Sequence, residues 1–189
     1  MSVIEIKVAL EHVEPSVTRT LQIPGSIRLD RLHLNLQAAL GWTNSHLYKF
    51  KAGEVTWSQL DPEFRGDDLP VNKTTLAQVL NDTGTDTISY IYDFGDYWEH
   101  ELRVGKATVP DPGELYPRLT DVSGRCPPED VGGSSGYEHF LEAISDPSHP
   151  EHEEMAEWAD GTFDPHTPDA DELRLNVFKL ARKWQPRKA

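Results

Sequence analysis

Two segments of the chain hold most of the side chains that could do chemistry. Residues 92–100 read Tyr-Asp-Phe-Gly-Asp-Tyr-Trp-Glu-His, and residues 126–133 read Cys-Pro-Pro-Glu-Asp-Val-Gly-Gly. They supply carboxylates, an imidazole and a thiol, which are the groups that enzymes use to hold metal ions and to move protons. We therefore expect the two segments to fold against each other around one polar pocket. The candidate pocket residues are Asp93, Asp96, Trp98, His100, Cys126, Glu129 and Asp130.

Asp93, His100 and Glu129 form a candidate metal site within this pocket. Carboxylate oxygens and an imidazole nitrogen together suit a divalent cation. No spacing such as His-Glu-x-x-His fixes the ligands, however, and buried polar networks are commonly structural. The favoured interpretation is therefore a carboxylate–histidine pair that locks the turn, with His100 half-buried and bonded to Asp93 or Asp96. On that interpretation no cofactor is expected, and a bound divalent cation is the alternative.

Cys126 raises a second hypothesis, in which it is a nucleophile with His100 as the base and Asp93 as the group that orients the base. It is the only cysteine in the chain, so no intramolecular disulfide can form. No local signature of a catalytic cysteine accompanies it. A small, packed apolar side chain is the favoured role.

The first part of the chain predicts a sheet wrapped over one helix. Residues 3–10 alternate between apolar and polar side chains, and residues 17–23 resume the alternation, so the two runs predict a β-hairpin. Residues 29–40 carry leucines at helical spacing and are followed by Gly41, which predicts a helix of about three turns. Further strands are expected at residues 46–50 and 54–57. The order strand-strand-helix-strand is typical of an α+β fold.

The remainder predicts more strands and then helices. We expect a loop at 58–73, a short helix capped by Thr74 or Thr75, and strands at 87–93 and 97–104 joined by a turn at Asp93 to Asp96. A Pro- and Gly-rich loop, laid against the body of the protein, is expected at 107–133. Three helices are then expected. The first begins with a capping box at Ser135, the second begins at Ser148 and buries Met155 and Trp158, and the third begins at Thr167.

These elements predict one α+β domain over residues 1–189, with a mixed or antiparallel sheet and helices packed on it. Residues 1–106 form the sheet, residues 107–133 the Pro- and Gly-rich loop, and residues 134–189 a helical part that ends the chain.

The charge of the chain argues against nucleic acid as a direct partner. The formal net charge is −14, and residues 110–172 carry 17 acidic side chains against two basic ones. Duplex-binding proteins usually present a clustered basic surface, and here the only basic cluster is Arg182-Lys183 with Arg187-Lys188. No run of about 20 apolar residues or signal peptide is present, so we expect a cytoplasmic protein without a membrane segment.

Several unusual strings, in this order, resemble the plasmid pRiA4b ORF-3-like family. They are Leu32-His33, Leu40-Gly41-Trp42, His46-Leu47-Tyr48-Lys49-Phe50, the two polar segments above, Gly136-Tyr137 and Phe140-Leu141. The resemblance implies an α+β domain that in some members is carried on plasmids or in insertion elements, and it implies no established activity. Thr18-Arg19 stands where the family usually has a Trp-Arg pair.

Three functions are compatible with these features. The favoured one is a protein- or peptide-binding accessory module of mobile-element origin, because an acidic surface, a free sheet edge and aromatic side chains occur without a complete catalytic set. These aromatic residues are Trp42, Tyr48, Tyr97 and Trp98. The second is a metal-assisted hydrolase that uses Asp93, Asp96, His100, Glu129 and Asp130. The third is a nucleic-acid-associated accessory protein, and the oligomeric state stays open.

Overall fold

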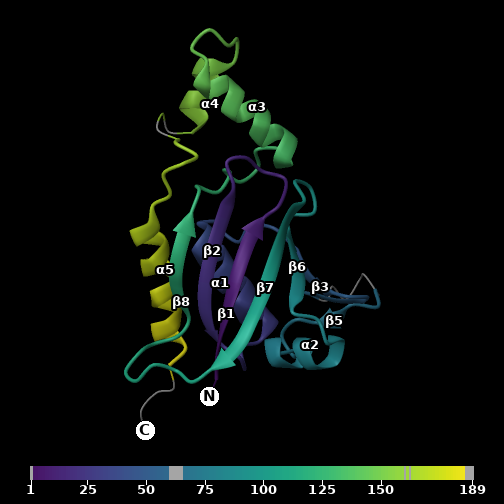
Figure 1. Ribbon diagram of the computed structural model, residues 1–189. Coiled ribbons are helices and arrows are strands. Elements are labelled where there is room, and N and C mark those ends of the chain that lie inside the picture. The colour runs from purple at the N-terminus through teal and green to yellow at the C-terminus, as the bar shows by residue number, and fades with distance from the viewer. Residues whose placement is uncertain (1, 60–65, 160, 162, 186–189) are drawn as a thin grey trace.

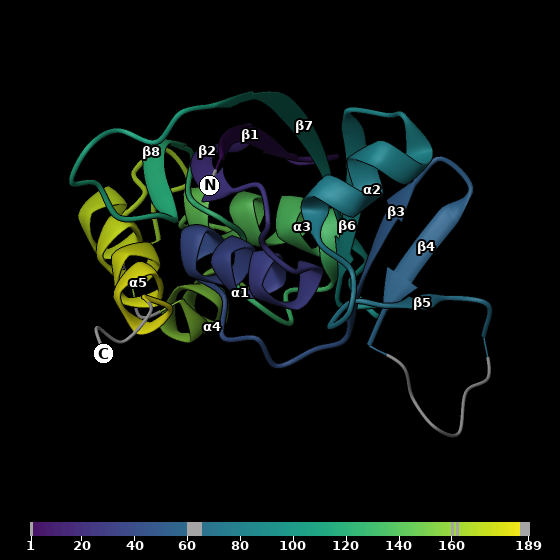
Figure 2. The same cartoon turned by 90° about the horizontal axis from the view of Figure 1, so that it is seen from below.

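An eight-stranded sheet with helices on one face and around its edge forms the body of the protein (Figures 1 and 2). The computed structural model describes residues 2–59, 66–159, 161 and 163–185. The strand order is β5-β4-β3-β6-β7-β1-β2-β8, and every neighbouring pair is antiparallel except β4 and β5, so the sheet is mixed. The predicted α+β class is confirmed. The strands are β1 (Val3–Leu10), β2 (Val17–Pro24), β3 (Tyr48–Ala52), β4 (Val55–Ser58), β5 (Leu69–Pro70), β6 (Thr87–Tyr92), β7 (Trp98–Thr108) and β8 (Arg118–Ser123).

The chain begins with the predicted strand-strand-helix-strand unit. Strands β1 and β2 pair from Leu10 opposite Val17 to Val3 opposite Pro24, as their alternating pattern requires. Helix α1 (Leu29–Leu40) buries its leucine stripe against the sheet, and Gly41 ends it in a left-handed conformation with φ 89°. Figure 2 shows α1 beneath the sheet. This helix and the sheet share one apolar core, so together they fix the frame that carries the loops described below.

Two predicted loops contain strands. Part of the predicted 58–73 loop forms β5, which pairs with β4, while residues 60–65 lie outside the described residues. The predicted 107–133 loop contains β8, which pairs with β2 and forms the other edge of the sheet. Strand β8 buries only Leu119 and lies between Pro- and Gly-rich stretches, so its short alternation gives a weak signal in the sequence.

The helices are α2 (Leu76–Thr83), α3 (Gly133–Ser145), α4 (His152–Trp158) and α5 (Ala170–Lys183). Thr75 caps α2 in a reciprocal capping box with Gln78, as expected. The capping box expected at Ser135 is wrong, because α3 already begins at Gly133 and Ser135 lies inside it. Helix α4 also differs from expectation, since Met155 is only half-buried and Trp158 is 48% exposed.

Helix α5 packs against α1 and β8, with Leu173, Val177 and Ala181 buried. By contrast, α3 and α4 lie beyond one end of the strands (Figure 1). Among the described residues, no helix combines the length and the apolar character needed to cross a membrane.

Candidate functional site

The two polar segments meet at the end of the sheet where β6 turns into β7. The backbone N–H of Gly132 donates to Oδ2 of Asp96 at 3.1 Å. Gly133, with φ 70°, approaches the turn so closely that a Cβ atom there would lie 2.6 Å from the carbonyl oxygen of Asp96. A residue with a side chain could not take this place without displacing backbone, so glycine allows the contact.

A third segment, the loop between α1 and β3, brings His46 to the same place. Nδ1 of His46 lies 3.6 Å from Oδ2 of Asp93, and Nε2 lies 3.1 Å from Oδ1 of Asp130. The backbone N–H of Asp93 donates to the carbonyl of Leu47 at 2.9 Å, which ties the β6–β7 turn to this loop. One potential ligand atom from each of His46, Asp93 and Asp130 lies within 4.8 Å of the others. We call these three residues the His46 cluster.

The His46 cluster extends from the interior to solvent. The side chain of Asp93 is 12% exposed, that of His46 28% and that of Asp130 72%. Nε2 of His46 is enclosed, and no described atom meets it in hydrogen-bond geometry although an Asp130 oxygen is near. One side of the cluster is therefore fixed by the protein, while the Asp130 side is open to water.

Glu129 anchors the loop that carries Asp130. Its Oε1 accepts a hydrogen bond from Tyr92 Oη at 2.6 Å, and its Oε2 accepts from the N–H and hydroxyl of Thr43 at 2.8 and 2.6 Å. Tyr92 Oη in turn accepts from the N–H groups of Ser45 and His46. Burial, followed by the Glu129 carboxylate, raises the pKa of Tyr92. Both oxygens of Glu129 thus accept hydrogen bonds that hold the loop in place, and Glu129 is not among the three residues whose potential ligand atoms converge.

The loop that carries His46 is held by a closed ring of hydrogen bonds under it. Gln37 Nε2 donates to Tyr90 Oη at 3.0 Å, and Tyr90 Oη lies 2.8 Å from His33 Nδ1. On the other side of the imidazole, His33 Nε2 lies 2.5 Å from Asn44 Oδ1. The backbone N–H of Asn44 then donates to Gln37 Oε1 at 3.0 Å. Every bond of the ring has one donor and one acceptor when the Tyr90 hydroxyl donates to His33 Nδ1 and the N–H at His33 Nε2 donates to Asn44 Oδ1. Desolvation lowers the pKa of His33 to about 4, so its imidazole is neutral at pH 7. The ring fixes Asn44, whose φ is 61°, two residues before His46.

His100 does not reach the site. It is fully buried in β7, its Nδ1 lies 3.2 Å from the carbonyl oxygen of Tyr90, and its ring packs edge-on against Trp42. Burial lowers its pKa to about 4. The expectation of a half-buried His100 bonded to Asp93 or Asp96 is wrong. Those aspartates lie in the turn, whereas His100 is two residues inside the strand on the face that points to the core.

Cys126 is also in the core. Its thiol lies 3.4 Å from Nη2 of Arg19, and burial raises its pKa to about 11. A thiol with this pKa is protonated at neutral pH, and it contacts a guanidinium in place of the imidazole that the nucleophile hypothesis requires. The favoured packing role agrees with this position.

Trp98 is buried and contributes to the core beside the site. Its ring lies 5.9 Å from that of Trp42, whose Nε1 donates to the carbonyl of Pro127 at 2.9 Å. Trp42 therefore fastens the 125–132 segment to the sheet, and Trp98 supports Trp42.

Arg19 closes the core where β2, α1 and β8 meet. It is 1% exposed, and its guanidinium donates to the carbonyl oxygens of Ala39, Thr18, Ser123 and Gly124 at 2.7 to 3.0 Å. Desolvation lowers its pKa. A buried cation held by four carbonyl oxygens and by the sulfur of Cys126 is an unusual arrangement, and it binds together segments about 100 residues apart in the chain.

A cavity of about 820 Å³ adjoins the His46 cluster, and His46 lines it. Charged and amide side chains make up much of the wall. Residues lining the cavity include Asp30, His33, Asn44, Tyr48, Asn72 and Lys73. A cavity of this size accommodates a small molecule beside the cluster.

Several of these residues were not identified from the sequence. His46 stands in a run that resembles a strand, and both of its partners come from distant segments. His33 and Gln37 lie four residues apart, beside the apolar stripe of α1, and this i, i+4 polar pair is the signal that could have revealed the ring. Asp93, Asp96, Glu129 and Asp130 do meet, whereas Trp98, His100 and Cys126 lie in the core behind them.

Comparisons with known proteins place the chain in a family. The model of the plasmid pRiA4b ORF-3-like proteins matches residues 2–172. The uncharacterised protein y4hQ of Sinorhizobium fredii is 44% identical over 184 residues, which cover 97% of this chain and 94% of that protein. The crystal structure of a protein of unknown function, MM3350 from Methanosarcina mazei, has a TM-score of 0.80 at 29% identity over 90% of this chain and 97% of that one. The chain belongs to the plasmid pRiA4b ORF-3-like family.

Proposed function

We propose that the protein binds a divalent metal ion through His46, Asp93 and Asp130 and uses it in hydrolysis. The observation that carries the proposal is the convergence of an imidazole and two carboxylates from three segments, with one ligand atom of each within 4.8 Å of the others. Mixed nitrogen and oxygen ligands of this kind suit Zn²⁺ and Mn²⁺.

Two further features support a cation. The carboxylates of Asp93 and Asp130 lie near the two ring nitrogens of one imidazole, so their negative charges favour a cation in the cluster. Nε2 of His46 is enclosed without an aligned hydrogen-bond partner among the described residues. A metal ion would satisfy both requirements.

The open side of the cluster supports a reactive site over a purely structural one. Three protein ligands leave coordination positions for water or substrate, and Asp130 faces solvent. A bound Zn²⁺ or Mn²⁺ would lower the pKa of a coordinated water and so supply a nucleophile near neutral pH. The adjoining cavity, with Lys73 and Asn72 in its wall, offers room for a substrate.

Thermal unfolding with added Mn²⁺, Zn²⁺ or Mg²⁺ tests the metal site. At 100 times its Kd, a cation should stabilise the protein by about 2.7 kcal/mol, which corresponds to roughly 5–10 °C in Tm. The shift should disappear in His46→Gln and Asp93→Asn. Asp121→Asn, an exposed change of the same kind on β8, should retain it. The absence of a shift in the wild type, or an equal shift in all variants, would refute the metal site.

Hydrolysis is tested separately with the metal-loaded protein. Bis-p-nitrophenyl phosphate and p-nitrophenyl acetate should be cleaved in proportion to metal occupancy, and cleavage should fall with metal binding in Asp93→Asn. If the metal binds and no ester is cleaved above the rate of the Asp93→Asn variant, the hydrolytic part of the proposal fails while the binding part stands.

A second candidate function, a protein- or peptide-binding accessory module of mobile-element origin, is favoured by a different observation. A groove of about 930 Å³ runs between α3 and the β1–β2 loop, away from the residues of the His46 cluster. The family takes its name from a plasmid gene product, which supports the mobile-element origin.

A further inference from the structure

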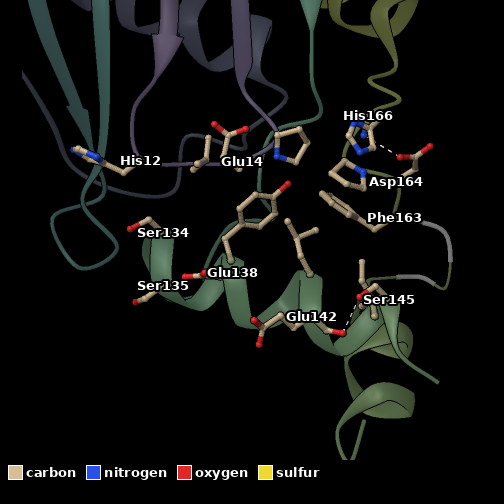
Figure 3. A pocket seen from close by; sticks show the side chains of 16 residues that line it. His12, Glu14, Ser134, Ser135, Glu138, Glu142, Ser145, Phe163, Asp164 and His166 are labelled. Carbon is tan, nitrogen blue, oxygen red and sulfur yellow. Dashed lines mark hydrogen bonds between the residues drawn. The ribbon is translucent and has the colours of Figure 1, made fainter. Parts of the chain in front are cut away.

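The groove beside α3 combines an apolar floor with an acidic rim (Figure 3). One wall is α3, a second is the 12–15 loop that joins β1 to β2, and a third is the 163–166 segment. None of the residues that line it belongs to the His46 cluster, so it is a separate candidate site.

The floor of the groove is preformed by packed aromatic and aliphatic side chains. Phe163 packs edge-on against Tyr137 and Phe140, with ring centroids 6.2 and 5.2 Å apart. Val13 and Tyr137 are buried, and Leu141 beside them is half-buried. A ligand therefore meets an apolar surface that needs no rearrangement to form.

Carboxylates dominate the rim. Figure 3 shows Glu14 on the loop side of the groove and Glu138 and Glu142 on α3. No described residue forms a hydrogen bond or ion pair with the side chains of these three glutamates, all of which are exposed. Asp164 adds a fourth carboxylate, which is bonded to the N–H of His166 and the hydroxyl of Thr167.

Three basic side chains lie beside the groove, against four carboxylates on its rim. His12 and His166 line the groove, and the guanidinium of Arg125 stacks 4.7 Å over the ring of Phe163. The three glutamates thus present negative charge on both sides of an apolar cleft, an arrangement that attracts cations and repels phosphates.

The floor also holds a polar atom without a partner. The hydroxyl of Tyr137 is buried and forms no hydrogen bond within the described part of the chain. Buried hydroxyls are normally paired. A ligand group that reaches the floor would supply the missing partner.

We propose that this groove, which we call the α3 groove, binds a peptide segment of another protein through a Lys or Arg side chain flanked by apolar residues. The inference rests on the second candidate function and names its ligand. The basic side chain would lie between Glu14 on one wall and Glu138 and Glu142 on the other, while its apolar neighbours cover Leu141 and Phe163. An apolar floor of this extent distinguishes a peptide from a simple polyamine.

Selection from a random peptide library displayed on phage tests the proposal with the full-length protein. Selection in EDTA keeps the outcome independent of the His46 cluster. We expect peptides enriched in Lys or Arg next to Leu, Ile or Phe. The most enriched peptide, labelled with fluorescein, should bind about tenfold more weakly when its basic residue is replaced by glutamine.

The double variant Glu138→Gln and Glu142→Gln should weaken binding of that peptide by about tenfold or more, because it removes two charges without changing shape. The matched control is Glu153→Gln with Glu154→Gln, which removes two exposed charges from α4 outside the groove and should leave affinity unchanged. Circular dichroism and Tm establish that both variants fold.

The other outcomes distinguish a failure of the basic peptide as ligand from a failure of the peptide-binding function itself. Enrichment of neutral or acidic peptides whose binding is unchanged in the α3 double variant would overturn the inference and leave a peptide-binding function intact. If spermidine displaces the peptide at a concentration similar to the peptide's own Kd, the groove binds polyamines, and the proposal that it binds a peptide is refuted. The recovery of no binding peptide would overturn both the inference and the second candidate function.

Discussion

The hydroxyl of Tyr90 lies 2.8 Å from Nδ1 of His33, and this contact closes a ring of hydrogen bonds between the sheet, α1 and the loop that carries His46. Each polar side-chain group in the contact is buried, and each has a partner. A fully satisfied buried network is rigid and specifies one arrangement of its members. The ring therefore holds Asn44, and with it the loop that positions His46, in one place.

Tyr90→Phe should destabilise the protein by about 1–3 kcal/mol, because it leaves His33 Nδ1 and Gln37 Nε2 buried without their partner. The measurement is the urea midpoint at pH 7. Tyr116→Phe, which removes a hydroxyl bonded at the surface to the N–H of Asp111, is the control and should change the free energy of unfolding by less than about 0.5 kcal/mol. Equal midpoints for the two variants would show that the ring does not stabilise the fold.

Stability should fall as the pH drops from about 6.5 to 4. The pKa values of His33 and His100 are lowered to about 4 in the folded protein, so below pH 6.5 the unfolded chain takes up protons that the folded protein does not. Each histidine contributes its full stability above pH 6.5 and loses about 1.4 kcal/mol per pH unit down to its folded pKa.

Urea unfolding from pH 4.5 to 7.5 measures this slope. His33→Gln, which can retain one hydrogen bond of the ring, should reduce the slope by about 1.4 kcal/mol per pH unit relative to the wild type. A variant with the wild-type slope would mean that His33 is not neutral in the folded state.

Cys126 should resist thiol reagents in the folded protein. Burial and a pKa raised to about 11 leave little thiolate at pH 8. Dithionitrobenzoate should therefore titrate one thiol rapidly in guanidinium chloride and almost none in native buffer. Rapid native reaction would revive the nucleophile hypothesis.

Gly133→Ala should destabilise the protein more than Gly53→Ala does. Both glycines have positive φ, which costs an alanine roughly 1 kcal/mol, but at Gly53 a Cβ would meet no atom within 4 Å. At Gly133 it would meet the Asp96 carbonyl at 2.6 Å. We expect an additional loss of about 1–3 kcal/mol and a weaker thermal shift with Mn²⁺, because the 129–133 segment must move away from the turn. Equal losses in the two variants would contradict the close contact.

The elements with a regular pattern were predictable from the sequence. The alternation at residues 3–10 and the leucine spacing at 29–40 report on burial along one face, which is a local property. Strand β8 was not predictable in this way, because only one of its six residues is buried. It forms by pairing with β2, about 100 residues earlier in the chain, and a local pattern does not report that contact.

The site was predictable only in part. Asp93 and Asp130 stand out because they lie in dense polar turns, and the structure brings those turns together. His46 was not found, because its role depends on which segment arrives beside it in space. His100 was assigned to the site because it is near Asp93 in the chain, but the period of two in β7 turns it to the core.

The buried guanidinium of Arg19 has a consequence for any shortened form of the protein. Two of its acceptors are the carbonyl oxygens of Ser123 and Gly124, so the first 106 residues alone would enclose a cation and lack half of the dipoles that solvate it. Such a fragment would have to open that corner of its core to water. The strands at the start of the chain thus depend on residues made much later, and a ribosome-bound N-terminal portion would complete its interior only after residue 124 had emerged.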